Sequence, residues 1–238
     1  MAREGKKRGS TRWQILRLAA RYFIEIGYSK TSLSRIAKEL GLSTGNITFY
    51  FPTKEHLLAV LVDELHGFHS IRVDRCAAEG RSSLLSYCLE LAVIAAACNE
   101  SDAARDFYSS CYASPLTLEL IRKKDTERTM DIFGAYQPKW KKQQWVVTEN
   151  LVSGLEYATL TTRENNMPLH MQIEKSLDAI LYLYGVPEDI RVQKIKQVLE
   201  MDYRATGRIM LGEFKEYIAR LNDEELEKAE EDALLALR

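Results

Sequence analysis

The sequence has no apolar run long enough to cross a bilayer, which would need about 18 residues. The longest candidate, residues 89–98, is interrupted by Glu90 and followed at once by Asn99 and Glu100. The basic N-terminus also lacks the apolar segment of a secretory signal. We therefore expect a soluble, cytoplasmic protein with no membrane partner.

Cysteine motifs for metal or redox chemistry are absent too. No C-x-x-C pair occurs, which argues against a zinc knuckle and a thioredoxin-like site. Asp63, His66 and His69 lie at i, i+3 and i+6 of an expected helix, so they drift around it rather than converge. We predict no metal site and no cofactor. The cysteines have small or apolar neighbours and are predicted to be buried free thiols: Cys76, Cys88, Cys98 and Cys111.

Catalytic signatures are missing as well. The chain contains no Gly-rich phosphate loop, no G-x-S-x-G and no H-E-x-x-H. Scattered serine, histidine and aspartate residues do not define a catalytic centre in a chain of this size. We therefore do not expect an enzyme.

Strand signals are nearly absent, whereas apolar residues recur at helical spacing between Gly, Pro and Asn breaks. The fold class predicted is all-α. Beyond the first 53 residues, helices are expected at about 54–78, 81–99, 102–112, 116–134, 139–165, 169–184 and 188–206, with one or two more in 208–236 that include a charged tail from Asn222 to Asp232.

Charge is distributed unevenly along the chain. Residues 1–60 hold 11 Lys and Arg against 4 Asp and Glu, a surplus of 7, so the remainder holds 22 against 30, a deficit of 8. A basic N-terminal segment, here called the head (residues 1–60), followed by an acidic remainder is the pattern expected when only the head contacts nucleic acid. A merely solvated basic face would look the same, so charge does not decide the question alone.

The first 53 residues have the pattern of three helices with a helix-turn-helix. A first helix from about residue 10 to 26 ends at Gly27, and a second begins at Thr31 or Ser32 and ends at Gly41. A third, very short helix runs from Ser43 or Thr44 to about residue 50. Two short amphipathic helices joined by a tight turn containing glycine are typical of helix-turn-helix DNA readers, although they also occur in proteins that never bind DNA.

The third helix has two different faces. A step of 100° per residue places Ile47, Tyr50 and Phe51 on one arc, which can pack on the first two helices. The other arc carries groups suited to a DNA groove: Gly45 permits close approach, Asn46 can pair with adenine, and Thr48 can contact a base edge or a thymine methyl. Phe49 lies on the same outer arc.

The head resembles the N-terminal domain of the TetR family of repressors. The resemblance covers about residues 12–60 and is carried by Phe23-Ile-Glu-Ile-Gly27-Tyr28, Thr31-Ser32, Ile36-Ala37, Gly41-Leu-Ser43, Gly45, Tyr50-Phe51 and Lys54-Glu55-His-Leu57. It implies a homodimer that reads a palindromic double-stranded operator and is released by a small-molecule inducer.

The resemblance also implies roles for single residues. Thr31 and Ser32 would hold a phosphate, and Tyr50 and Lys54 would fix the DNA backbone, with Arg8 and Arg12 as further contacts. The family commonly has tyrosine where this chain has Thr48, which puts one contact in doubt. The residues expected in the major groove, with Phe49 beside them, are Thr44, Gly45, Asn46 and Thr48.

The remaining chain, residues 54–238, is expected to form a larger helical domain for ligand binding and dimerisation. Large aromatic and sulfur-containing side chains of the middle helices are candidates for the ligand site, although ordinary cores contain them too: Phe107, Tyr108, Tyr112, Met130, Phe133, Tyr136 and Trp140. Two later apolar stripes suit either a dimer interface, which we favour, or packing within one chain: Trp145, Val146, Leu151, Leu155 and Leu160, and Ile173, Leu177, Ile180, Leu181 and Leu183.

The sequence thus predicts a ligand-responsive transcriptional repressor with an N-terminal DNA-binding domain over residues 1–53. The alternative is a helical small-molecule-binding or interaction protein that does not read DNA sequence. Within the DNA-binding class, an activator or a nucleoid organiser also stays open.

Overall fold

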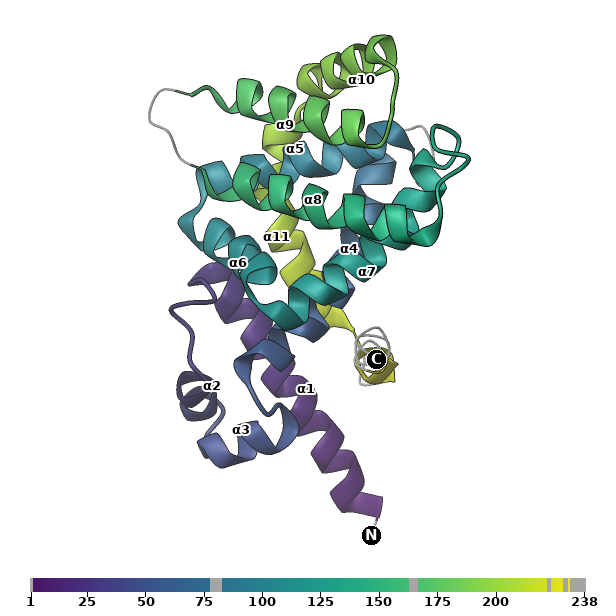
Figure 1. Ribbon diagram of the computed structural model, residues 1–238. Helices are drawn as coiled ribbons and strands as arrows, with labels where there is room; N and C mark the ends of the chain where they lie inside the picture. Colours follow the sequence, from purple (N-terminus) through teal and green to yellow (C-terminus); the bar gives the residue numbers. More distant parts are fainter. Residues whose placement is uncertain (1, 78–82, 163–166, 222–223, 229–230, 232–238) are drawn as a thin grey trace. The chain divides into compact units, whose positions relative to one another are not determined.

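The computed structural model describes residues 2–77, 83–162, 167–221, 224–228 and 231, and for residues 2–10, 70 and 74 it describes the backbone only. These residues form helices and no strand, which confirms the all-α fold class (Figure 1). No helix in these ranges is long and apolar enough to span a membrane. The helices are α1 (Ala2–Glu25), α2 (Leu33–Glu39), α3 (Thr44–Tyr50), α4 (Lys54–Ala77), α5 (Leu84–Glu100), α6 (Asp102–Ala113), α7 (Pro115–Phe133), α8 (Lys142–Thr161), α9 (Leu169–Leu183), α10 (Glu188–Glu200) and α11 (Tyr203–Arg220).

Two expected helix boundaries were wrong. The first helix begins at Ala2 rather than near residue 10. The helix expected over 188–206 is two helices, because the chain breaks at Met201 and Asp202. The Asp202 carboxylate accepts a hydrogen bond from the Ala205 backbone N–H at 3.0 Å, which caps the start of α11. Of the charged tail predicted from Asn222 to Asp232, residues 224–228 and 231 are described and are helical, and the other residues lie outside the described ranges.

The chain divides into two compact units. The first comprises Met1–Leu65, Asp102–Leu120 and Leu211–Arg238, and the second comprises His66–Ser101 and Ile121–Met210. Each unit is therefore built from segments that are far apart in the sequence, and helices α4, α7 and α11 each contribute residues to both.

In the first unit, α2 and α3 pack against α1 (Figure 1). The side chains at their contact are apolar and fully buried, and burial of each such side chain stabilises the fold by about 1.5–3 kcal/mol. This core fixes the angle between the two short helices, which have few residues and little intrinsic stability of their own. The core residues include Ile15, Leu16, Ala19, Phe23, Ile36, Ile47 and Phe51.

The loop between α1 and α2 is held by α6 of the same unit. Gly27 has φ +106°, and a Cβ there would lie 2.6 Å from Oδ2 of Asp106. The same carboxylate oxygen accepts a hydrogen bond from the backbone N–H of Ser29 at 2.7 Å. Glycine is therefore required at this position by both backbone conformation and space.

We expect Gly27→Ala to lower the free energy of unfolding by about 1–3 kcal/mol, because it combines an unfavourable φ with a clash at Asp106. Gly67→Ala is the matched control, since Gly67 lies within α4 and the Cβ that alanine adds there would meet no atom within 4 Å. The control should leave stability unchanged or raise it slightly. Urea unfolding measures both variants, and equal stabilities would contradict this account of the loop.

In the second unit, α5 packs against α8, α9 and α10, and α8 and α9 pack side by side (Figure 1). Three aromatic rings meet at its centre. The rings of Phe133 and Tyr184 stack with centroids 4.1 Å apart, and Tyr87 contacts Phe133 edge-on at 5.2 Å. The cysteines form no disulfide; Cys88, Cys98 and Cys111 are buried, as predicted, whereas Cys76 is half-buried.

The second unit also contains a buried ion pair. Nη1 of Arg128 lies 2.6 Å from Oε2 of Glu90, and Nδ1 of His69 lies 3.7 Å from Oε1 of the same carboxylate. Burial alone would raise the pKa of Glu90, but Arg128 and His69 outweigh it and hold this pKa well below its usual range. The carboxylate is therefore charged at neutral pH and balances a buried guanidinium.

We expect Glu90→Gln to lower the free energy of unfolding at pH 7 by about 3–5 kcal/mol, because Arg128 would keep a buried charge without its partner. The pKa of Glu90 is lower in the folded than in the unfolded chain. The stabilisation is therefore complete above the ordinary carboxyl pKa and is lost as the pH falls below it. The difference in the free energy of unfolding between wild type and Glu90→Gln, measured by urea unfolding, should therefore become smaller as the pH is lowered from 7 to 3. A difference that does not change with pH would contradict the assignment.

Candidate functional site

The short helix α3 is fixed at both ends. Ser43 is its N-cap, and the Ser43 hydroxyl accepts a hydrogen bond from the Asn46 backbone N–H at 3.2 Å. On its inner side Ile47 is fully buried, and Phe51, directly after the helix, is 1% exposed. The guanidinium of Arg12 lies 4.8 Å from the Phe51 ring centroid, on its face. The predicted inward arc is confirmed for Ile47 and Phe51, whereas Tyr50 is half-buried.

The opposite side of α3 is open to solvent. Thr44, Gly45, Asn46 and Thr48 are exposed, and 68% of the Phe49 surface is accessible. A side chain added at Gly45 would meet nothing closer than the Ser43 hydroxyl at 3.7 Å. The structure thus brings five of the predicted DNA-contacting residues together on one exposed face, with open space in front of the glycine.

Asn46 is tied into the cap of its own helix. Its side-chain oxygen accepts hydrogen bonds from the Ser43 hydroxyl at 2.6 Å and the Ser43 backbone N–H at 3.3 Å. Together with the bond from the Asn46 N–H, these contacts form a capping box. Two-point pairing with adenine uses both the oxygen and the N–H of the Asn46 side chain, so it would require the capping box to open. The side-chain N–H groups alone can donate to a base while the box stays closed.

Thr31 and Ser32 have different positions. Thr31 is 2% exposed, and its hydroxyl donates to the Gly27 carbonyl at 2.8 Å, so it stabilises the loop from inside. Ser32 is exposed and is the N-cap of α2, where its hydroxyl accepts from the Arg35 N–H at 3.2 Å. Of the two residues predicted to hold a phosphate, Ser32 presents its side chain to the outside.

Lys54, at the start of α4, is bound to the loop before α2. Its ammonium group donates to the carbonyls of Tyr28 and Thr31 at 3.0 and 3.1 Å and lies 3.9 Å from the Tyr28 ring centroid. Burial lowers the pKa of Lys54, against the opposing effect of Glu55 and Asp106. Two of its three donors therefore hold the protein together, a role that the sequence pattern did not reveal. The side chain of Arg8, a further predicted contact, lies outside those described.

This geometry agrees with comparisons to known sequences. The profile of the family described as "Bacterial regulatory proteins, tetR family" matches residues 15–61, which include α2, α3 and the turn between them. This N-terminal domain belongs to the TetR family. The prediction made from the residues of the head is thereby confirmed.

Relatives match the same end of the chain. The HTH-type transcriptional regulator TtgR of Pseudomonas putida is 39% identical over 59 residues, which cover 25% of this chain and 28% of TtgR. An uncharacterized HTH-type transcriptional regulator of Bacillus subtilis, YuxN, is 32% identical over 80 residues, or 34% of this chain and 28% of the relative. The match thus spans little more than a quarter of these relatives, and no solved structure matches the chain.

The residues predicted to line a ligand site fall into both units. Phe107, Tyr108 and Tyr112 are on α6 in the first unit, and the first two are buried. The other four are in the second unit, where Phe133 is fully buried, Met130 is 40% exposed, and Tyr136 and Trp140 are half-buried. Trp140 contacts Trp145, with ring centroids 4.8 Å apart.

The residues of the two apolar stripes predicted to form a dimer interface differ in how far they are buried. Val146 and Leu151 are 40% and 56% exposed, whereas Leu155 and Leu183 are half-buried. The other six pack within one chain, which was the alternative prediction, and are unavailable to a partner: Trp145, Leu160, Ile173, Leu177, Ile180 and Leu181. The exposed apolar stripe of α8 instead runs through Val147, Leu151, Gly154 and Ala158.

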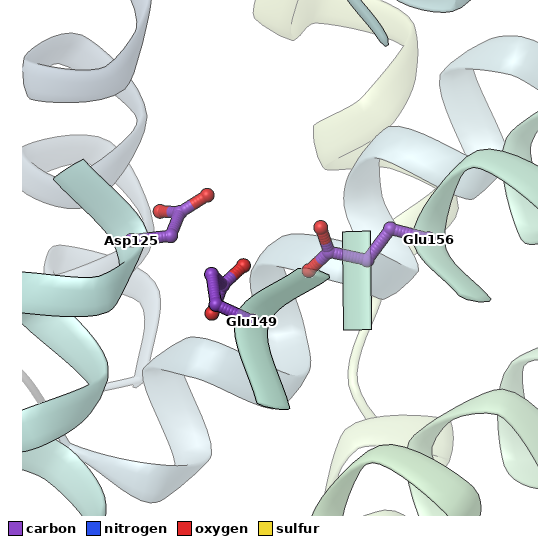
Figure 2. Close-up of side chains that lie close together, drawn as sticks. All are labelled: Asp125, Glu149 and Glu156. Carbon is purple, nitrogen blue, oxygen red and sulfur yellow. The ribbon is translucent and has the colours of Figure 1, made fainter. Parts of the chain in front are cut away.

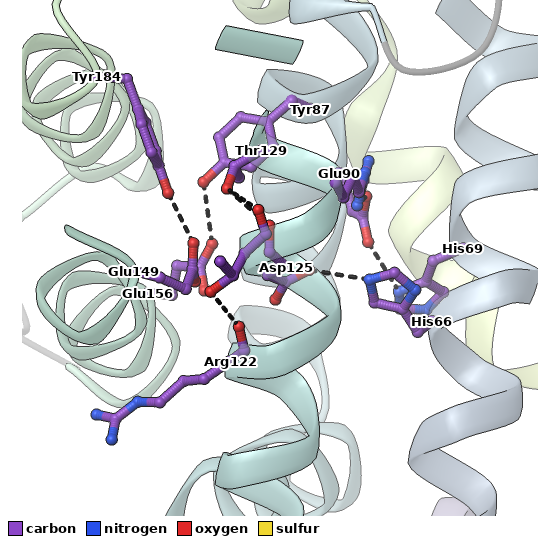
Figure 3. Close-up of polar contacts among 12 residues, drawn as sticks. His66, His69, Tyr87, Glu90, Arg122, Asp125, Thr129, Glu149, Glu156 and Tyr184 are labelled. Carbon is purple, nitrogen blue, oxygen red and sulfur yellow. Dashed lines mark hydrogen bonds and ion pairs between the residues drawn. The ribbon is translucent and has the colours of Figure 1, made fainter. Parts of the chain in front are cut away.

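The sequence reasoning also missed polar residues at the centre of the second unit. Glu149 is 1% exposed, and the Tyr184 hydroxyl donates to its Oε2 at 2.6 Å (Figure 3). Burial, and then the nearby charge of Asp125, raise the pKa of Glu149 to about 8. No local motif marks these residues, because a glutamate in a helix is normally solvated; the one available signal was the apolar residues around it on α8.

Proposed function

We propose that the protein is a ligand-responsive transcriptional regulator, most simply a repressor, that binds a palindromic operator as a homodimer. The observation that carries this proposal is the exposed face of α3, which presents small and polar groups together with Phe49 on a capped helix within a TetR-family domain. Such a face can enter a major groove, while the surplus of positive charge in residues 1–60 attracts phosphates. On this proposal residues 1–53 read DNA and 54–238 bind the ligand and dimerise.

Within the proposed DNA contact, the structure favours a division of roles. Thr44, Gly45, Thr48 and Phe49 would face the bases, with Asn46 donating through its amide N–H groups. Ser32 and Tyr50 would meet the DNA backbone. Thr31 and Lys54 would keep the loop and helix starts in position, because their polar groups already bond to backbone carbonyls.

The proposed dimer interface is the exposed stripe of α8. Val147, Leu151, Gly154 and Ala158 recur at i, i+4, i+7 and i+11, so they lie on one side of the helix. Their small and apolar side chains suit close packing against the same face of a second chain. The two N-terminal domains of the dimer would then bind the two half-sites of a palindrome, as the symmetry of a homodimer requires.

The proposed response to a ligand is a shift between two states of the dimer. A small molecule that binds the second unit more tightly in the state that cannot bind DNA would release the operator. Among the predicted ligand residues of the second unit, Met130, Tyr136 and Trp140 keep accessible surface. Large aromatic and sulfur-containing side chains of this kind would suit an aromatic or lipophilic inducer.

Capture of fragmented genomic DNA on the purified protein, followed by sequencing, tests this function. Wild type should enrich one palindrome, and a Thr48→Ala, Phe49→Ala variant should lose that enrichment, because both side chains lie on the exposed face of α3 without supporting its core. Enrichment of the same fragments by both proteins would show that α3 does not read the sequence. No enrichment by wild type at low salt would favour the binding protein that does not read DNA.

A further inference from the structure

Three carboxylates converge inside the second unit. Asp125 comes from α7, and Glu149 and Glu156 come from α8, seven residues apart and therefore on one side of that helix. Each offers an oxygen, and these oxygens all lie within 4.8 Å of one another (Figure 2). Figure 2 shows the Glu149 carboxylate between those of the other two residues.

Glu149 is not satisfied by the protein around it. The residue is 1% exposed, and its Oε2 accepts a hydrogen bond from Tyr184, but its Oε1 has no hydrogen-bond partner among the described residues. A buried, incompletely bonded carboxylate beside two others is costly unless a cation or a proton balances it. Arg122, a nearby guanidinium on α7, donates its Nε–H to the Ser153 hydroxyl at 2.9 Å instead.

Each carboxylate is oriented by a group from a different element (Figure 3). Nε2 of His66 on α4 lies 2.9 Å from Oδ1 of Asp125. The Tyr184 hydroxyl, directly after α9, donates to Glu149 at 2.6 Å, and the Tyr87 hydroxyl on α5 donates to Glu156 at 3.4 Å. Outer contacts of this kind hold the ligands of protein metal sites in place.

We propose that Asp125, Glu149 and Glu156 form a binding site for one divalent metal cation. All three ligands are oxygens, which favours Mg²⁺, Mn²⁺ or Ca²⁺ over the softer ions that prefer nitrogen and sulfur. The span of the oxygens fits metal–oxygen distances of about 2.1–2.5 Å, with water completing the coordination. The site lies within the second unit and does not depend on DNA reading by the first.

Mn²⁺ is the first probe, because electron paramagnetic resonance measures the free ion directly. The full chain, first treated with a chelator, should take up one Mn²⁺ per chain, with Mg²⁺ and Ca²⁺ competing. Glu149→Gln keeps an oxygen that can accept from the Tyr184 hydroxyl but removes the negative charge. Asp125→Asn likewise keeps an oxygen beside Nε2 of His66 and removes the negative charge. Each should raise the dissociation constant by about 10-fold or more.

Glu174→Gln is the matched control, because Glu174 lies on α9, its side chain is 43% exposed, and one oxygen of its carboxylate lies 3.3 Å from the Lys175 ammonium group. It should bind Mn²⁺ like wild type. Circular dichroism and urea unfolding establish that each variant is folded. No uptake by wild type, or equal uptake by folded Glu149→Gln, would overturn the proposal and leave a carboxyl that holds a proton instead.

Terbium luminescence locates the ion without relying on a variant. The Trp145 ring lies 6.1 Å from that of Tyr184, whose hydroxyl contacts Glu149, so Tb³⁺ at the site should emit on tryptophan excitation. Ca²⁺ should displace the signal. Absence of sensitised emission, or emission that Ca²⁺ leaves unchanged, would contradict the proposed location. Neither assay contains DNA, so failure of the metal site and failure of the proposed regulator function are separate results.

Discussion

Gly45→Glu is expected to reduce DNA binding by about 100-fold or more while leaving the domain as stable as wild type or slightly more stable. Residue 45 is the second residue of α3, after the N-cap Ser43 and Thr44. A carboxylate there would be repelled by DNA phosphates and would occupy the space through which the helix approaches a groove. The loss should appear in fluorescence anisotropy with the captured operator duplex.

The stability of Gly45→Glu should not fall together with its DNA affinity. Glycine is unfavourable inside a helix, and a negative charge in the first turn interacts well with the helix dipole, so the free energy of unfolding should stay equal or rise by up to about 1 kcal/mol. Gly67→Glu adds the same charge to an exposed position of α4 with open space around it. That control should bind DNA like wild type. Equal loss in both variants would mean that net charge, not the α3 face, governs binding.

Val147→Glu is expected to convert the proposed dimer into a monomer. Val147 is 59% exposed in one chain and is the first residue of the α8 stripe. In a symmetric interface the substitution would place two carboxylates in one apolar contact, which costs several kcal/mol through desolvation and repulsion. The dimer dissociation constant should rise by about 100-fold or more, and operator affinity should fall with it.

Val192→Glu is the matched control for this experiment. Val192 is also a valine that is 59% exposed, but it lies on α10, outside the proposed interface. Sedimentation velocity should report a dimer for wild type and Val192→Glu and a monomer for Val147→Glu. A wild-type monomer, or a Val147→Glu dimer of unchanged stability, would contradict a dimer interface on the α8 stripe.

The head could be predicted in detail from the sequence because its signals are local. Gly27 and Gly41 have positive φ at the ends of the first two helices, and Ser32 and Ser43 are the N-caps of α2 and α3. Each of these features depends on a few neighbouring residues. The burial of Ile47 and Phe51 followed from helical periodicity alone.

Other features of the head depend on contacts that local patterns do not show. Asp106 reaches the loop after α1 from 77 residues away, so nothing near Ser29 reveals it. Lys54 was expected to fix the DNA backbone, but it bonds to two carbonyls of the preceding loop. The capping box of Ser43 and Asn46 was missed because asparagine occupies a position where glutamate or glutamine is usual.

The larger part of the chain was predictable as helices but not as a site. Periodicity marks a buried face without saying what covers it, and for that reason Trp145 and Leu177 were assigned to a dimer interface although each is buried within one chain. The convergence of Asp125, Glu149 and Glu156 depends on how α7 packs beside α8. Such packing follows from the tertiary fold and leaves no spacing rule in the sequence.

Hydroxyl-radical footprinting of wild type on the captured operator is the most direct test of the central claim that α3 reads DNA within a symmetric dimer. We predict two protected regions related by the two-fold symmetry of the palindrome, with centres about one helical turn of DNA or a multiple of it apart. Gly45→Glu should leave both regions unprotected at the same concentration. A single protected region, uniform protection along the fragment, or protection by Gly45→Glu equal to that of wild type would contradict the claim.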